Sequence, residues 1–404
     1  MVGCLSNAGY EIVENPDKAT FMIYNTCAVK TPTENRMICL LKRVPRNKKL
    51  IVTGCLPLIN FERLKAEVEF DGAIGPSSGD RIIEVTRRVG SGERVVILGN
   101  NSKPSLDLPR IRVNKIISIV PINYGCLGAC SYCCVRFARG QLRSYSIREI
   151  IGRIKCDLNS GVREVWLTSQ DTACYGKDIG TDLISLLDAI CRIDGEFFVR
   201  IGMMNPNYAL DMLDDLVQVF KDDRVFKFIH LPVQSGDDQV LKLMNRLYSV
   251  ADFEKIVYQF RKQIPEITLA TDVICGFPGE DDAAFNRSLK LVVAIKPDVV
   301  NVSKFFPRPR STAEKSRIPP REVKNRSKRI AELCNQISFE KNKKWTNSTV
   351  RILIDEEGKC PASWIGRNCA YKPTVIKSNE PLFGRFLNAR ITRAFATYLE
   401  AEIE

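Results

Sequence analysis

The sequence predicts an α/β protein made of three consecutive parts, and three observations lead to that prediction. Strand and helix patterns alternate over residues 1–98, as in a doubly wound parallel sheet. Over residues 113–300 a strand and a helix recur about every 30 residues, which predicts six βα units of a partial barrel. The last 59 residues contain short strands and turns, which is typical of a small β-barrel.

The N-terminal part contains two apolar strands, and each ends at a cysteine. The strand at residues 20–29 contains Cys27, and the strand at residues 48–56 ends with Cys55 and Leu56. Because ligands bind at the carboxyl edge of a doubly wound sheet, both thiols are expected at that edge. They are either ligands of a second iron–sulfur cluster or two buried structural thiols. Helices are expected over residues 31–44, 59–70 and 80–90.

The central part contains six strand patterns separated by amphipathic helices. Residues 99–110 are polar and contain proline, which predicts a linker before this part. One more long helix is expected over residues 321–345, so that the predicted domains are 1–98, 112–340 and 346–404. The strands are expected over residues 115–125, 164–171, 197–204, 226–236, 267–277 and 298–306.

Composition limits the class of protein. The 60 Lys and Arg exceed the 47 Asp and Glu, and the net charge of +13 favours a polyanionic partner such as nucleic acid. An acidic membrane surface is the second choice, and a basic surface without such a partner is the alternative. Most of the charge lies in residues 304–344, with 13 basic and 4 acidic residues, whereas residues 346–404 are nearly neutral. Phosphate contacts are predicted there and at four arginines within residues 126–148.

The 15 cysteines are interpreted as thiols or metal ligands of a cytoplasmic enzyme. Disulfide-dense proteins are small and secreted, whereas this chain has 404 residues and begins without the pattern of a signal peptide. No apolar run reaches the about 18 residues that a membrane span needs, so no membrane partner is predicted. With one histidine in the chain, iron–sulfur ligation is favoured over zinc sites that contain histidine.

Three cysteines follow the first predicted barrel strand at close spacing. Cys126, Cys130 and Cys133 have the pattern C-x3-C-x2-C. Three thiolates on one short loop can bind three irons of a [4Fe–4S] cluster and leave the fourth iron open. A zinc knuckle is the alternative, but zinc usually takes four ligands in pairs, and no second pair follows. Cys134 lies outside the spacing and is interpreted as a packed thiol.

Polar side chains occur at the ends of several predicted barrel strands, where barrel enzymes place their active sites. We expect them to bind a ligand, with capping and loop roles as the alternatives. His230 is interpreted as an imidazole packed at a strand end rather than a catalytic group. The candidates are Thr168, Gln170, Asp171, Arg200, Asn205, Gln234, Ser235 and Asp272.

Longer motifs resemble those of one enzyme family. NTCAVKTPTEN and TGCLP resemble the N-terminal cluster domain, and YGCLGACSYCCVRFARGQLRSYS resembles the radical SAM loop, of the radical S-adenosylmethionine (SAM) methylthiotransferases. The resemblance extends along the chain through the motifs RIGMMNP, HLPVQSG, MNRLYS, TDVICGFPGE and GRNCAYKP. The order of the three parts matches the family's N-terminal domain, radical SAM barrel and TRAM RNA-binding barrel. TPTEN, SQDT and GMMNP are most similar to the archaeal and eukaryotic branch, which acts on N6-threonylcarbamoyladenosine in tRNA.

This resemblance implies an enzyme that adds a methylthio group to C2 of N6-threonylcarbamoyladenosine at position 37 of the anticodon loop. It implies a [4Fe–4S] cluster on the three-cysteine loop with SAM at the open iron, and SAM contacts from the strand-end candidates. It also implies a second [4Fe–4S] cluster at Cys27 and Cys55, a tRNA anticodon stem-loop as partner, and a reductant such as ferredoxin or flavodoxin. The alternatives are a methylthiotransferase for isopentenyladenosine tRNA or for a ribosomal protein, and an RNA-binding form inactive through N-terminal truncation.

One departure from the family pattern concerns the N-terminus. The family's N-terminal domain supplies three cluster ligands, one from each of three strand ends, whereas residues 1–19 resemble the helix after the first strand. The repeat places the third cysteine roughly a dozen residues before Cys4. A side chain on that helix points away from the strand-end edge, so Cys4 is not expected to replace it. We therefore expect the chain to lack its first strand and the third ligand.

Overall fold

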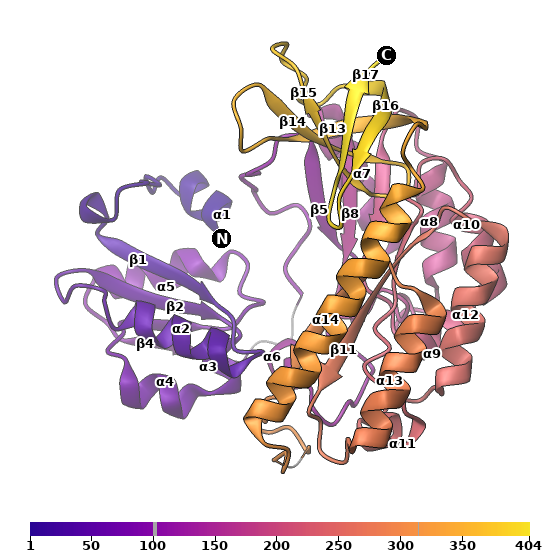
Figure 1. Cartoon of the computed structure of the whole chain (residues 1–404). Helices are drawn as coiled ribbons and strands as arrows, with labels where there is room; N and C mark the ends of the chain where they lie inside the picture. Colours follow the sequence, from indigo (N-terminus) through magenta and orange to yellow (C-terminus); the bar gives the residue numbers. More distant parts are fainter. Residues whose placement is uncertain (100–102, 314) are drawn as a thin grey trace. The chain divides into compact units, whose positions relative to one another are not determined.

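The computed structural model describes residues 1–99, 103–313 and 315–404 and divides into two compact units (Figure 1). The N-terminal unit combines Met1–Arg112, Tyr124–Arg143 and Phe306–Lys315. The barrel unit combines Val113–Asn123, Ser144–Phe305 and Ser316–Glu404. The three-cysteine loop therefore belongs to the same unit as the N-terminal domain, although the sequence analysis assigned it to the barrel domain. The predicted linker at residues 99–110 lies partly outside the described residues.

The N-terminal unit contains a parallel four-stranded sheet in the order β1-β2-β3-β4. Leu50 and Val52 of the second strand point to one face and Ile51 to the other, because successive side chains of a strand alternate. Apolar residues pack on both faces of the sheet, which explains why the sequence of the second strand is a continuous hydrophobic run. The strands are β1 (Phe21–Thr26), β2 (Lys49–Gly54), β3 (Gly72–Ile74) and β4 (Val95–Ile97).

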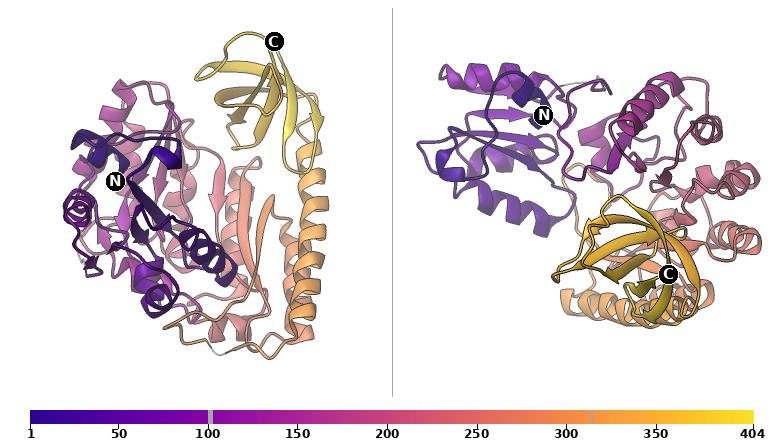
Figure 2. Two further views of the ribbon diagram at one scale, coloured as in Figure 1. Left: turned by 90° about the vertical axis from the view of Figure 1, so that its left-hand side faces the viewer. Right: turned by 90° about the horizontal axis from the view of Figure 1, so that it is seen from above.

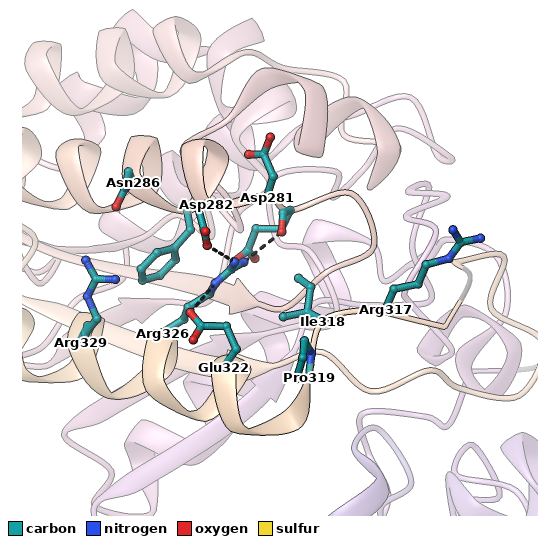
Figure 3. A pocket seen from close by; sticks show the side chains of 11 residues that line it. Asp281, Asp282, Asn286, Arg317, Ile318, Pro319, Glu322, Arg326 and Arg329 are labelled. Carbon is teal, nitrogen blue, oxygen red and sulfur yellow. Dashed lines mark hydrogen bonds and ion pairs between the residues drawn. The ribbon is translucent and has the colours of Figure 1, made fainter.

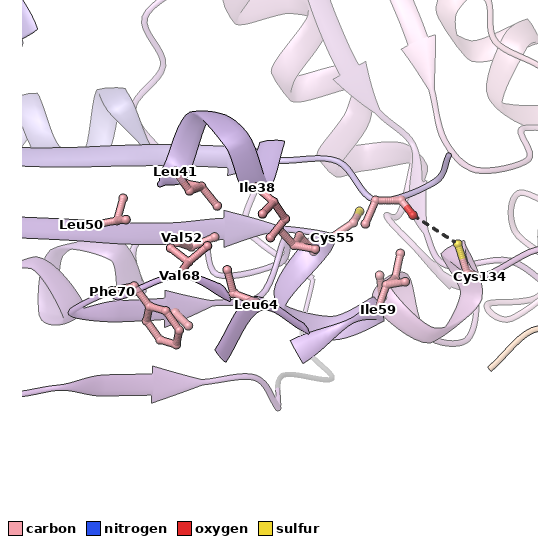
Figure 4. Packing of buried hydrophobic residues seen from close by; sticks show 14 residues of the cluster. Ile38, Leu41, Leu50, Val52, Cys55, Ile59, Leu64, Val68, Phe70 and Cys134 are labelled. Carbon is pink, nitrogen blue, oxygen red and sulfur yellow. Dashed lines mark hydrogen bonds between the residues drawn. The ribbon is translucent and has the colours of Figure 1, made fainter. Parts of the chain in front are cut away.

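Helices cover both faces of this sheet, which confirms the doubly wound expectation. Ile38, Leu41 and Leu64 pack against the face of Leu50 and Val52 (Figure 4). The first and last helices of the domain pack on the opposite face. The helices are α1 (Val2–Asn7), η1 (Pro16–Lys18), α2 (Thr31–Leu41), α3 (Leu56–Ile59), α4 (Phe61–Glu67) and α5 (Arg81–Gly90).

The barrel unit contains the six predicted strands as two parallel three-stranded sheets, in the orders β5-β8-β9 and β10-β11-β12. An isolated bridge joins Val199 and Val225, next to the facing edges of the two sheets. The prediction of a partial barrel is thus confirmed. The strands are β5 (Ile117–Pro121), β8 (Glu164–Thr168), β9 (Phe198–Ile201), β10 (Phe228–His230), β11 (Thr268–Cys275) and β12 (Val299–Lys304). A two-stranded sheet of β6 (Asn123–Tyr124) and β7 (Arg143–Ser144) brackets the three-cysteine loop.

Local sequence signals explain where several barrel helices begin. Ser146 and Ser249 form capping boxes with Glu149 and Asp252, so that backbone N–H groups of the first turn find acceptors. Within the described parts of the chain, no helix has the length and apolarity that crossing a membrane requires. The helices are α7 (Ile147–Asn159), α8 (Leu183–Cys191), α9 (Pro206–Asp211), α10 (Leu213–Val219), α11 (Asp238–Leu243), α12 (Val250–Gln263), α13 (Asp282–Ile295) and α14 (Pro320–Lys343).

The C-terminal part is a closed five-stranded barrel at the end of α14, as predicted (Figure 2). Ile352, Ile376 and Ile391 lie fully buried in its core. Bulges in the first and fourth strands help the small sheet to curve and close. The strands are β13 (Thr349–Glu357), β14 (Ser363–Asn368), β15 (Pro373–Lys377), β16 (Phe386–Ala394) and β17 (Leu399–Ile403).

Candidate functional site

The three-cysteine loop lies between β6 and a short helix, α6 (Val135–Arg139). Gly125 enters the loop with φ of +78°, and a Cβ there would meet the Gln141 carbonyl oxygen at 1.9 Å, so only glycine fits. The Gly128 N–H donates to the Cys126 sulfur at 3.2 Å, and the Cys130 sulfur also lies beside Gly128. The backbone thus points a donor at a sulfur, and hydrogen bonds of this kind tune iron–sulfur clusters.

The donor set of this loop suits an iron–sulfur cluster. Cys126, Cys130 and Cys133 are all partly exposed, whereas the neighbouring Cys134 is buried. Burial raises the pKa of the Cys134 thiol to about 11. This placement agrees with its interpretation as a packed thiol. Among the residues that the structure describes, no group of three or more His, Cys, Asp or Glu side chains is arranged to hold a metal ion. The assignment of the three ligands therefore stays a prediction.

The second pair of cysteines lies at one edge of the N-terminal sheet. Cys27 follows β1 and Cys55 follows β2, and the Cys55 N–H donates to the Thr26 carbonyl at 2.9 Å. Gly54 has φ of +94°, and a Cβ there would lie 2.2 Å from the Thr26 oxygen, so glycine permits this close approach. Burial raises the pKa of the Cys55 thiol, and the neighbouring Arg139 guanidinium partly offsets that effect. The expected shared edge is confirmed, while a cluster there stays a prediction.

The tertiary structure brings these two groups of cysteines together within the N-terminal unit. Helix α6 packs against α3, and Cys134 shares a buried apolar cluster with Cys55 and Ile59 (Figure 4). The Cys134 thiol donates to the carbonyl oxygen of Ala28, the residue after Cys27, at 3.8 Å. Nothing in the sequence local to either group of cysteines indicates this contact.

In the barrel unit, Asp171 links the ends of β8 and β9. Its side chain is 1 % exposed, and Oδ1 accepts hydrogen bonds from the backbone N–H groups of Ala173 and Asn205. Burial raises the pKa of Asp171 to about 6. Arg246 donates to Asn205 Oδ1 at 2.8 Å and to the Pro232 carbonyl after β10. The ends of three strands are thus joined by one polar network, and Arg246 is a member that the sequence analysis missed, although it lies in the MNRLYS motif.

A second polar group connects β10, β11 and β12. Asp272 Oδ1 accepts a hydrogen bond from Asn301 Nδ2 at 2.7 Å and lies 3.1 Å from His230 Nε2. The strand register places Asp272 beside Asn301, which explains that contact. His230 is partly buried at the end of its strand, as expected, but its carboxylate partner was not anticipated.

The remaining candidates differ in their surroundings. Gln234 has φ of +68° and forms a bridge with Val273, and the Ser235 hydroxyl accepts from the Asp237 N–H, which is a loop role. Thr168 ends β8, and Gln170 is partly exposed beyond it. The ligand contacts of these residues stay predictions.

Arg200 has neighbours that the sequence did not suggest. Its guanidinium lies 5.5, 4.9 and 5.1 Å from the ring centres of Trp166, Phe228 and Tyr371. Tyr371 belongs to the turn between β14 and β15, so Arg200 faces the C-terminal barrel. Aromatic faces therefore surround the charge of Arg200, and its contact with a ligand stays a prediction.

Three of the thirteen basic residues in segment 304–344 form ion pairs with buried carboxylates, and two of the three, Arg308 and Arg326, are themselves buried. Arg326 is 4 % exposed and binds Glu280, Asp282 and Glu322 in the wall of a cavity of about 900 Å³ (Figure 3). The other two are Arg308, which pairs with Glu34, and Lys341, which pairs with Asp298. These three charges maintain the fold, so the count from sequence overstates the charge available to RNA. Residue 314 of this segment lies outside the described residues.

Three family models match successive parts of the chain. The descriptions are Uncharacterized protein family UPF0004 for residues 1–75, Radical SAM superfamily for residues 120–292 and TRAM domain for residues 343–403. Among solved structures, the fold is similar to that of the radical S-adenosylmethionine methyltransferase TsrM from Kitasatospora setae. The TM-score is 0.54 at 12 % identity, over 84 % of this chain and 68 % of that chain. This likeness supports the fold alone.

Curated relatives match the chain from end to end. A protein of Pyrococcus abyssi named "Probable threonylcarbamoyladenosine tRNA methylthiotransferase" is 44 % identical over 408 residues, which cover 100 % of this chain and 95 % of the relative. The human threonylcarbamoyladenosine tRNA methylthiotransferase is 35 % identical over 412 residues, covering 100 % of this chain and 70 % of the relative. The resemblance found in the sequence motifs is thus confirmed, and the chain belongs to the family of threonylcarbamoyladenosine tRNA methylthiotransferases.

Proposed function

We propose that this chain is a radical SAM enzyme that adds a methylthio group to C2 of N6-threonylcarbamoyladenosine at position 37 of tRNA. The observation that carries the proposal is the 44 % identity, over the whole chain, to a relative named for this activity. The occurrence of both cysteine groups in one compact unit supports it. The relatives do not favour the isopentenyladenosine and ribosomal-protein alternatives.

Two groups of residues would hold the cofactors. Cys126, Cys130 and Cys133 would bind a [4Fe–4S] cluster that leaves one iron for SAM, and Cys27 and Cys55 would provide ligands of a second cluster. When bound, these groups supply the radical chemistry that an aromatic C–H bond requires, because no side chain can remove that hydrogen as a proton. The partly exposed thiols and the backbone donor at Gly128 support this assignment.

The strand ends of the barrel unit offer groups that complement SAM. Asp272 is a partly exposed carboxylate, which would attract the ammonium group and accept hydrogen bonds from hydroxyl groups, whereas the buried Asp171 is kept as a candidate at the adjoining strand end. Their positions are held by the contacts with Asn205 and Asn301. We keep Thr168, Gln170, Arg200, Gln234 and Ser235 as further candidates.

The tRNA partner is supported by the TRAM match and by exposed basic residues. Arg321, Lys324 and Lys328 are exposed on α14 at spacings of three and four residues, so they lie on one face of the helix. Such a stripe suits a row of phosphates. We further propose a reductant protein such as ferredoxin or flavodoxin and a cytoplasmic location.

The test is a reaction with the purified, anaerobically reconstituted protein. It is mixed with SAM, dithionite and tRNA that carries N6-threonylcarbamoyladenosine, and the digested nucleosides are analysed by mass spectrometry. We expect the 2-methylthio nucleoside, and no product from the Cys130→Ala variant. Isopentenyladenosine tRNA serves as the competing substrate. Conversion of only that tRNA would overturn the proposed substrate, and tight tRNA binding without turnover would indicate an inactive RNA-binding form.

A further inference from the structure

The segment of residues 306–313, which follows β12, belongs to the N-terminal unit, and we call it the strap. It contains Arg308, whose side chain is 4 % exposed. The Arg308 guanidinium donates to Glu34 Oε2 and to the Thr31 hydroxyl, both in the first turn of α2. One arginine thus fastens a segment from the end of the barrel sequence to the N-terminal domain.

Both carboxylate oxygens of Glu34, the acceptor in this ion pair, accept hydrogen bonds. Glu34 is 1 % exposed, and Oε1 also accepts from Arg63 and Asn60, at 2.9 and 2.7 Å. Burial alone would raise its pKa, but the hydrogen bonds from Arg308, Arg63 and Asn60 outweigh burial and hold the pKa below its ordinary value. A buried ion pair adds little net stability compared with apolar packing. We therefore interpret the pair of Arg308 and Glu34 as a contact that fixes the position of the strap on α2.

The strap then reaches the three-cysteine loop itself. The Ala313 N–H donates to the Ser131 carbonyl at 2.9 Å, and the Thr312 hydroxyl approaches the same oxygen at 3.5 Å. Ser131 lies between Cys130 and Cys133, so the contact falls inside the motif. The strap therefore binds the backbone of the loop at the point where the loop must present two thiols.

Further contacts hold the end of the loop. Cys134, the residue after Cys133, is buried at the end of the loop. Arg310 places its guanidinium 4.6 Å from the ring centre of Phe137 on α6. On its other side, Cys134 donates to Ala28 at the edge of the sheet. The end of the loop is thus held by the strap and by the sheet edge.

We propose that Arg308 is a positioning residue for the three-cysteine loop: its ion pair with Glu34 fixes the strap, and the strap fixes the backbone from Ser131 to Cys134. This inference rests on the proposed function, because it assumes that the loop binds a cluster. Ligands of such sites must be held to within about 0.5 Å by surrounding contacts. Within the loop, the Cys133 N–H donates to the Cys130 carbonyl, and the strap adds contacts from a distant segment of the chain.

The barrel unit offers a matched control. Arg326 is also 4 % exposed and also binds a buried carboxylate, that of Glu280, but both belong to the other unit. Arg308→Met and Arg326→Met therefore remove similar buried charges, and only the first acts on the loop. Arg308→Lys keeps the charge but loses the forked geometry that reaches Glu34 and Thr31 at once.

The experiment uses the full chain in a Cys27→Ala, Cys55→Ala background, reconstituted anaerobically, so that about four irons per chain report on one cluster. The electron paramagnetic resonance spectrum of the reduced cluster is recorded with and without SAM. We expect Arg308→Met to lose the SAM-induced spectral change and to bind SAM at least tenfold more weakly, with a partial return in Arg308→Lys. Arg326→Met should lower the melting temperature and leave the spectra unchanged.

The outcomes separate this inference from the proposed function. A background protein that binds no cluster would contradict the proposed function, whatever the Arg308 variants do. A background protein with normal spectra, together with an Arg308→Met variant that keeps the same spectra and SAM affinity, would overturn the positioning role. If Arg308→Met does not fold, Glu34→Gln decides, since it removes the same ion pair with almost no change of shape. A folded Glu34→Gln with unchanged spectra would equally overturn the role.

Discussion

The carboxylate of Asp298 joins three parts of the barrel unit and allows a quantitative prediction. Asp298 immediately precedes β12 and is 4 % exposed, and it accepts hydrogen bonds from Lys341 Nζ at 2.6 Å and Lys372 Nζ at 2.7 Å. Lys341 belongs to α14, and Lys372 belongs to the turn before β15. Burial alone would raise the pKa of Asp298, but the two ammonium groups outweigh burial and hold it below its ordinary value.

Replacing Asp298 by Asn should destabilise the protein strongly. The amide leaves two ammonium groups without their countercharge, and Lys372 is only 7 % exposed. Removing one partner of a buried ion pair costs about 3–5 kcal/mol. Lys341 is 21 % exposed and can turn towards water, so only Lys372 is left buried without its countercharge. We therefore expect the free energy of unfolding to fall by an amount within this range, and not by twice that amount. At roughly 2–4 °C per kcal/mol for units of this size, the melting temperature should fall by about 6–20 °C.

The assay is urea and thermal unfolding of the wild type, Asp298→Asn and Lys372→Met. In Lys372→Met, the Asp298 carboxylate still accepts hydrogen bonds from Lys341 and from the Leu269 N–H. The free energy of unfolding should therefore fall clearly less in Lys372→Met than in Asp298→Asn. Since the folded-state pKa of Asp298 is lowered, its contribution is present above the unfolded pKa of about 3.9 and disappears as the pH falls through the folded value. A loss below about 1 kcal/mol in Asp298→Asn at neutral pH would refute the reasoning.

Three further predictions concern the two candidate sites and the basic helix. Burial raises the pKa of Asp171 from 3.8 to about 6. Its contribution to the free energy of unfolding is therefore fully present below about pH 4 and is lost as the pH rises through 6. Between pH 4 and 7, the free energy of unfolding of the wild type should therefore fall by up to about 3 kcal/mol relative to that of Asp171→Asn. Denaturant titrations at several pH values measure this difference, and parallel pH profiles of the two proteins would contradict the prediction. The Cys130→Ala variant should bind about four irons fewer than the wild type in an anaerobic iron determination, and an equal content would contradict the ligand assignment. Replacing Arg321, Lys324 and Lys328 together by Gln should reduce the salt dependence of tRNA affinity, by about 0.7–0.9 in logarithmic slope per lost phosphate contact. Fluorescence anisotropy at several salt concentrations measures this slope, and an unchanged value would exclude these side chains as phosphate contacts.

The elements of the fold were predictable because their signals are local. The apolar run at residues 48–56 becomes β2, and the alternation in residues 346–404 becomes a closed barrel. The position of Cys27 and Cys55 at one sheet edge also followed from the sequence, since parallel strands present their carboxyl ends together. In each case the spacing of residues along the chain is enough to determine the result.

The side-chain partners of the site were not predictable. Asp272 contacts His230 and Asn301, which lie 42 and 29 residues away, and Glu34 pairs with Arg308 across 274 residues. No local pattern in a single sequence indicates which of the many charged residues meet across such distances. The same holds for Arg200, whose aromatic neighbour Tyr371 comes from the C-terminal barrel.

The sequence by itself indicated the class of chemistry, because three cysteines at C-x3-C-x2-C spacing on a short loop are the pattern expected for three ligands of one iron–sulfur cluster. Only the tertiary structure decided which unit the loop belongs to and which charges remain available. It groups the loop with the N-terminal sheet and the strap, and it pairs Arg308, Arg326 and Lys341 with buried carboxylates. The physical reason is that a motif depends on neighbours along the chain, whereas burial and ion pairing depend on which distant segments pack together.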